Sequence, residues 1–98
     1  MDLPSLADEV LTGLEVVACK VEPGCALDGK RLMDTSLRKK YGVTVVGIRH
    51  AGQIIPSPGG DAFLHGDDTV FLFASPASLT TVIPFFRTDP EPERAEDL

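Results

Sequence analysis

The hydrophobic pattern of this chain changes its period near the middle, and that change constrains the fold more than any other feature. Over residues 28–41 the apolar side chains Leu32, Met33, Leu37 and Tyr41 fall near helical spacing. From Val43 onward, beyond a single glycine, the residues are apolar and often β-branched, as in a strand. A polar Asp-Thr-Ser step interrupts the helical stretch. We therefore expect one or two short helices there rather than one long helix.

Four segments have the composition of strands: residues 14–21, 43–50, 53–55 and 69–74. The first is apolar enough for a strand buried on both faces, and the last is apolar throughout, which predicts a central position. A tight turn at Ala51-Gly52 joins the second and third segments as a hairpin. These elements together predict an α+β fold, a small and mostly antiparallel four-stranded sheet with two or three short helices.

The domain boundaries follow from the two ends of the chain. Residues 1–13 predict an N-terminal helix or linker that ends at a glycine. Residues 14–86 form one domain, which is all that a chain of 98 residues can build. Within it, a serine followed by a proline at 75–76 predicts a capped helix start. Residues 87–98 are rich in Pro, Glu and Asp and predict a disordered acidic tail.

Charge and hydropathy exclude several classes of function. The net charge of −6 argues against nucleic-acid binding and against attachment to anionic lipid by charge. No signal-peptide pattern is visible at residues 1–4, and no apolar run approaches the roughly 18 residues of a membrane span. We therefore expect a cytoplasmic protein, or the cytoplasmic part of a larger one. Cys19 and Cys25 are expected to be free thiols, although a local disulfide is compatible with their spacing.

The histidines and aspartates show no spacing typical of a metal site. His50 and His65 fall at predicted strand ends without a third histidine or zinc-like cysteines, so we expect surface imidazoles. Asp61, Asp67 and Asp68 surround one loop, and carboxylates can bind calcium, but their spacing is not that of an EF-hand. Asp67 is expected instead to accept hydrogen bonds from the backbone of its turn. The sequence therefore predicts no metal site.

The sequence shows no Ser/His/Asp or Cys/His arrangement typical of nucleophilic catalysis. It also shows no glycine-rich phosphate-binding loop with a lysine. We therefore predict that the chain is not an enzyme. A basic run, Arg38-Lys39-Lys40, stands out in an otherwise acidic chain. It is either a solvated helix end, where cations complement the helix dipole, or an anion site, because arginine can make two bonds to a phosphate. Gly42 and Thr44 follow closely and would admit a nucleotide-like ligand.

Several segments, taken together and in order, resemble the TrkA-C domain, also called RCK-C. They are residues 21–30 with 37–43, Val46-Gly47-Ile48-Arg49, Ile54-Ile55-Pro56, and residues 64–70. The resemblance covers Leu14 to Val82. It implies a regulatory lobe, attached at the cytoplasmic side to potassium channels, potassium-uptake systems or cation–proton antiporters. It also implies a small α+β fold that forms a homodimer.

Several members of that family bind cyclic di-AMP across the dimer interface. The resemblance places the ligand-binding positions of this chain at Leu37, Arg38, Lys39, Val43, Thr44 and Pro56. It implies no other cofactor. Members that hold cyclic di-AMP tend to carry asparagine where this chain has Thr44, and a hydroxyl matches only part of the amide's hydrogen bonding to adenine.

Two functions remain open at this point. The first is a ligand-sensing regulatory domain of a potassium or other cation transport protein, with the membrane transport or channel domain as its partner and a small molecule as effector. The alternative is a purely structural dimerisation module with no ligand. Neither function requires nucleic acid or direct insertion into a membrane. An enzyme acting on small molecules would be a third class, for which the residues offer no support.

Overall fold

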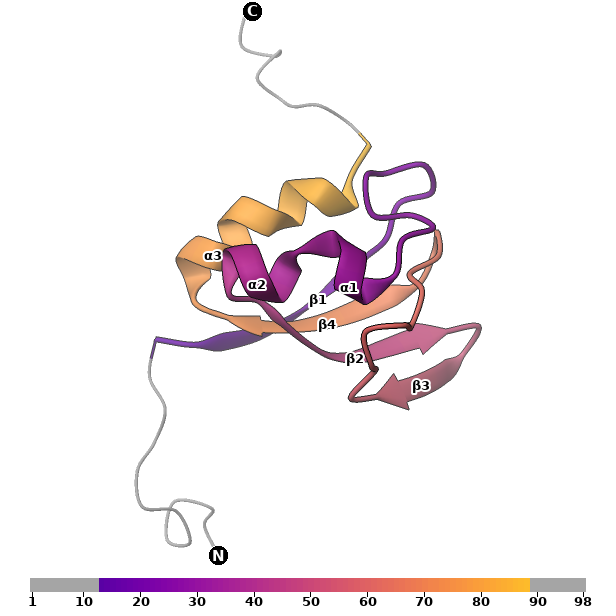
Figure 1. The fold of residues 1–98 in the computed structure, drawn as a ribbon, viewed down its shortest axis with the longest axis horizontal. Coiled ribbons are helices and arrows are strands. Elements are labelled where there is room, and N and C mark those ends of the chain that lie inside the picture. The colour runs from indigo at the N-terminus through magenta and orange to yellow at the C-terminus, as the bar shows by residue number, and fades with distance from the viewer. Residues whose placement is uncertain (1–12, 89–98) are drawn as a thin grey trace, which may run out of the picture.

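The computed structural model describes residues 13–88 (Figure 1). Four strands form one sheet in the order β1-β4-β2-β3, and every neighbouring pair is antiparallel. The strands are β1 (Glu15–Lys20), β2 (Thr44–His50), β3 (Gln53–Pro56) and β4 (Thr69–Ala74). The predicted α+β fold class is thus confirmed. The predicted N-terminal helix and nearly all of the acidic tail lie outside the described residues.

Strand β4 lies at the centre of the sheet, as its apolar composition predicts. Alternate residues Val70, Leu72 and Ala74 are buried against the helices, while the residues between them are half-buried on the other face. The hairpin of β2 and β3 is also confirmed, with Ala51 and Gly52 both at positive φ in its turn. The two apolar faces of β4 therefore correspond to a buried face under the helices and a half-buried outer face.

The prediction that the first strand is buried on both faces is wrong. Val16 is 60% exposed and Ala18 is exposed as well, whereas Val17 and Cys19 are half-buried. Val16 and Ala18 lie on the face turned away from the helices, and β1 pairs with β4 alone, so that it forms an edge of the sheet in the described part of the chain. The apolar composition of the segment indicates that it is partly buried, but it does not show which elements cover it.

The helical elements gather on one side of the sheet (Figure 1). They are α1 (Leu32–Thr35), α2 (Leu37–Tyr41), α3 (Pro76–Val82) and the 3-10 helix η2 (Ile83–Phe86). Ser36, at a φ of 62°, separates α1 from α2, so the predicted break is confirmed. Ser75 caps α3 as predicted, because its side chain accepts a hydrogen bond from the Ser78 amide. The 3-10 helix was not predicted.

One hydrophobic core lies between the helices and the sheet. Its largest fully buried side chains are Phe86, Leu37, Ile48, Leu64, Leu72, Val21, Val43, Val70 and Val82. Helix α2 contributes Leu37 and η2 contributes Phe86, so both short helices are held to the sheet by apolar contacts rather than by their own length.

Candidate functional site

A small cleft opens beside α2, and we call it the α2 cleft. It has a volume of about 240 Å³ and lies between the two short helices, the start of β2 and the loop that follows β3. Its lining residues are Leu32, Met33, Thr35, Leu37, Arg38, Val43, Thr44, Val45, Pro58, Gly59 and Gly60.

The glycine after α2 brings the two sides of this cleft together. Gly42 adopts a φ of 71°, which side chains disfavour, and its N–H donates to the Arg38 carbonyl over 3.1 Å. The next amide, that of Val43, donates to the Leu37 carbonyl over 2.9 Å. These bonds close the helix and turn the chain directly into β2. Arg38 on the helix and Thr44 on the strand consequently line the same cleft.

The far wall is a loop that the backbone fastens to α1. The Met33 amide donates to the Gly60 carbonyl, and the Leu32 amide donates to the Ala62 carbonyl, each over 2.9 Å. A Cβ at Gly60 would approach the Met33 side chain to 3.3 Å, so glycine permits this close contact. The loop is therefore a defined part of the cleft.

Of the six positions that the family resemblance singles out, four line the α2 cleft: Leu37, Arg38, Val43 and Thr44. Lys39 lines an adjoining hollow that shares Leu37 and Arg38 with the cleft. Pro56 is not among the lining residues, because it is the last residue of β3 and pairs with Gly47. Pro58, two residues further on, lines the cleft instead.

Sequence reasoning also missed Met33, Thr35 and the glycines at 59 and 60. Met33 and Thr35 belong to α1, and the two glycines belong to the loop that is hydrogen-bonded to α1. The Pro-Gly-Gly stretch predicts a loop that reverses the chain direction after the hairpin. Where that loop packs depends on its contact with α1, which the local sequence does not specify.

The α2 cleft combines apolar side chains with a cation, Arg38, at its edge. Leu37 and Val43 are 1% and 0% exposed, whereas Met33 is 56% exposed on the rim. Arg38 is exposed, and within residues 13–88 its guanidinium forms no ion pair with a carboxylate. The exposed Met33, beside a guanidinium with no ion-pair partner in residues 13–88, suits a ligand that carries both a flat ring and a phosphate.

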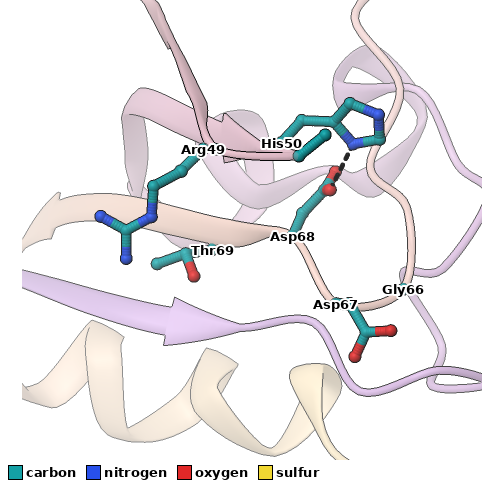
Figure 2. Close-up of a pocket in the computed structure, with 8 residues that line it drawn as sticks. Arg49, His50, Gly66, Asp67, Asp68 and Thr69 are labelled. Carbon is teal, nitrogen blue, oxygen red and sulfur yellow. Dashed lines mark hydrogen bonds and ion pairs between the residues drawn. The ribbon is translucent and has the colours of Figure 1, made fainter.

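A second polar site lies where β2 ends, and we call His50, His65 and Asp68 the β2 corner. The Asp68 side chain is only 3% exposed. One of its oxygens lies 2.6 Å from His50 Nδ1 (Figure 2), and the other accepts the His65 backbone N–H over 2.9 Å. The His65 Nδ1 lies 3.7 Å from that second oxygen. The two histidines are exposed, as expected, but they share one buried carboxylate.

The role predicted for Asp67 belongs to its neighbour. The Asp67 carboxylate is 72% exposed and lies 3.8 Å from Lys20 Nζ. The Asp68 carboxylate instead accepts the hydrogen bond from the backbone N–H of His65 in the turn. The φ of Asp67 is 75°, so the turn itself rotates this side chain outward. Among the described residues, the one cluster with metal-binding geometry contains Asp68 and the two histidines, and neither Asp61 nor Asp67 belongs to it.

Asp28 joins two loops that are distant in sequence. Its carboxylate oxygens accept the Gly24 amide over 2.8 Å and the Gly66 amide over 3.0 Å. The Asp-Gly pair of the family-like segment at 21–30 thus has a structural role, because it holds the turn after β1 against the loop before β4.

Two titratable groups elsewhere have shifted pKa values. Hydrogen bonds from the Thr88 amide and hydroxyl lower the pKa of the Glu22 carboxyl, and Arg87 adds a smaller effect in the same direction. Burial raises the pKa of the Cys19 thiol, against a smaller opposing effect of Arg87. Both cysteines are free, as predicted.

In the described part of the chain, no helix has the length and hydropathy needed to cross a bilayer. No curated protein sequence matches the chain significantly.

Solved structures share this fold. The RCK_C domain dimer of S. agalactiae BusR, in complex with c-di-AMP, is 23% identical with a TM-score of 0.68, and the match covers 76% of this chain and 93% of that one. The RCK C domain of the potassium transport protein KtrA, also in complex with c-di-AMP, is 23% identical with a TM-score of 0.64 over 79% and 84% of the two chains. The GsuK RCK domain is 24% identical with a TM-score of 0.63, and this match covers 76% of the present chain but 16% of that one.

The family model of the TrkA-C domain matches residues 16–87, which include all four strands except the first residue of β1. The matched range contains all the segments on which the resemblance rests. The chain belongs to the TrkA-C domain family.

Proposed function

We propose that this chain is a regulatory domain that binds a small nucleotide, such as cyclic di-AMP, and acts as a dimer within a protein that controls transport of potassium or another cation. The observation that carries this proposal is Arg38, an exposed cation with no ion-pair partner in the described chain, at the rim of an apolar cleft. The BusR and KtrA domains of the same fold have been solved with c-di-AMP, which supports this choice of ligand class.

The size of the α2 cleft supports a dimer. Its volume of about 240 Å³ is below the range of about 300–1,000 Å³ that is usual for small-molecule sites. A dinucleotide with two-fold symmetry would fill two such clefts if a second copy faced the first. Each Arg38 would then bind one phosphate, and the exposed Met33 would contact a base. A ligand of this kind favours one dimer arrangement by its difference in affinity for the two.

The domain would act by binding rather than catalysis, on the cytoplasmic side of the membrane and with the transport or channel domain of a parent protein as its partner. The expectation that it does not bind nucleic acid rests on the net charge of −6 alone. BusR, which shares the fold, has also been solved with its promoter DNA.

A dimerisation module without a ligand is the second candidate, and the outer face of the sheet favours it. Cross-strand partners place Val16 beside Phe73 and Ile54 beside Arg49 on the face turned away from the helices. Val16 is 60% exposed and Ile54 is 54% exposed. Such an apolar surface suits an isologous contact between two copies.

The test is a calorimetric titration of the full chain with cyclic di-AMP, with light scattering to determine the mass. We expect a dimer that binds the dinucleotide. Arg38→Ala should weaken binding by about tenfold or more, since a charge-assisted hydrogen bond contributes about 1.5–3 kcal/mol. Lys40→Ala is the matched control, because Lys40 lies on the same helix but lines neither hollow. A dimer that binds no nucleotide would favour the assembly module.

A further inference from the structure

The β2 corner brings together three side chains that are good ligands for a transition metal. His50 ends β2, whereas His65 and Asp68 belong to the loop before β4. One ligand atom from each lies within 4.8 Å of the other two. The corner borders an open cleft of about 400 Å³ that shares no lining residue with the α2 cleft.

The distances fit a metal ion after small movements. Tetrahedral zinc with bonds of about 2.0–2.1 Å holds its ligand atoms about 3.3 Å apart. The Asp68 oxygens lie 2.6 Å from His50 Nδ1 and 3.7 Å from His65 Nδ1, so the two observed spacings bracket that value. The imidazole side chains are 51% and 56% exposed, which leaves both rings free to turn.

The carboxylate is already fixed in place for this role. Asp68 is buried, and the His65 backbone N–H anchors one of its oxygens. A carboxylate has about four lone-pair positions, so this bond and the contact with His50 leave room for a metal. The neighbouring Arg49 does not compete for the carboxylate, because its guanidinium lies over the Phe71 ring and extends away from the corner (Figure 2).

We propose that His50, His65 and Asp68 bind a divalent transition metal, Zn²⁺ in the first instance, with water in the fourth position. Two imidazoles and one carboxylate are the ligand set of open zinc sites and are unsuited to Ca²⁺ or Mg²⁺, which prefer oxygen. The metal takes the place of the hydrogen atom between His50 Nδ1 and Asp68, and the neutral imidazole then carries its one ring proton on Nε2. This inference is independent of nucleotide binding, and it revises the expectation from the sequence that the chain has no metal site.

The bound metal would link the turn of the β2–β3 hairpin to the loop before β4. A ligand that binds only the folded state raises the melting temperature. We therefore expect Zn²⁺, but not Mg²⁺ or Ca²⁺, to raise the melting temperature of the untagged full chain at neutral pH. A competition titration with a chelating dye should give one equivalent of bound Zn²⁺. Absence of binding, or equal stabilisation by Ca²⁺, would overturn the proposal.

Variants locate the site. His50→Gln and His65→Gln should each weaken Zn²⁺ binding by about tenfold or more, since even outer-shell partners of a metal contribute 10–100-fold. Asp67→Asn is the matched control, because it removes the adjacent exposed carboxylate and asparagine tolerates a positive φ. Zinc binding that survives the double histidine variant, or that falls as far in the control, would place the metal elsewhere.

A spectroscopic measurement on the unmutated chain avoids any dependence on how the variants fold. Co²⁺ in a site of nitrogen and oxygen ligands gives visible absorption without the near-ultraviolet band of a cobalt–thiolate bond. We expect such a spectrum here. A thiolate band would assign the metal to Cys19 or Cys25 and overturn the proposal.

Discussion

The β2 corner and the α2 cleft both carry charged groups, but those groups differ in their partners. In the corner, Asp68 is buried and receives an amide and an imidazole within 3 Å. In the cleft, Arg38 is exposed and has no ion-pair partner among the residues described. Without a metal, the Asp68 charge stabilises the fold, whereas the Arg38 charge is available to a nucleotide. Substitution of Asp68 should therefore reduce stability, and substitution of Arg38 should reduce nucleotide affinity.

The largest expected effect is at the centre of the corner. Asp68→Ala should lower the free energy of unfolding by about 2 kcal/mol, because it leaves the part-buried His65 amide without its acceptor and removes the bond to His50. Asp67→Asn, at the adjacent exposed position, should change stability by less than about 0.5 kcal/mol. Urea denaturation of both variants measures this. Equal losses would mean that burial of the carboxylate is unimportant.

Asp28 extends the comparison to a carboxylate that is less buried. Asp28→Ala should cost about 1–2 kcal/mol, since two backbone amides lose their acceptor and two loops lose their link. Asp34→Ala should cost no more than about 0.5 kcal/mol, because its pair with Arg31 is exposed and lies within one helical turn. Chemical denaturation provides the values. A larger loss for the Asp34 variant would contradict the comparison.

The cleft should respond in affinity and scarcely in stability. Thr44→Asn supplies both a donor and an acceptor to an adenine edge and should strengthen cyclic di-AMP binding several-fold. Thr44 is exposed near the start of β2, so the change in stability should stay below about 1 kcal/mol. Calorimetry and thermal unfolding measure the two quantities together. Unchanged or weaker affinity would remove Thr44 from the proposed site.

The smallest effect is expected at Glu22, a half-buried residue whose carboxylate accepts hydrogen bonds from Thr88. The folded-state pKa of Glu22 is lowered by the bonds from Thr88, so its stabilising contribution is present above the unfolded pKa and is lost as the pH falls through the folded value. Glu22→Gln should therefore lower the melting temperature slightly at about pH 7 and not at about pH 3. A difference that grows in acid would contradict this assignment.

Local signals were sufficient for most of the fold. Gly42, Ala51-Gly52 and Ser75 each terminate or begin an element by their own backbone geometry, and the structure confirms all three. The position of β1 could not be predicted in the same way. Whether a strand is central or at an edge depends on how many partners it has, and the only partner of β1 in the described chain is β4, at the other end of the domain.

The sites follow the same rule. Arg38 and Thr44 were found because one glycine turn brings them together. The contact between His50 and Asp68 was not predicted. It depends on the register of β2 against β4, which no turn residue in the sequence indicates. That Pro58 lines the cleft, and not Pro56, has a similar origin. The loop is held to α1 by backbone hydrogen bonds, and the local sequence does not show which residues make them.

The pairing of β1 with β4 also determines when this domain can fold during synthesis. The register pairs Glu15 with Ala74, so β1, the first strand to be synthesised, can pair only after β4, the last strand, has been made. The hairpin of β2 and β3 can form as soon as it emerges, but the edge strand stays without a partner until nearly the whole domain has been made. Contacts so distant in sequence slow folding, because the chain loses loop entropy before it gains the contact. The apolar residues of β1 are then a risk for aggregation that ends only when β4 arrives.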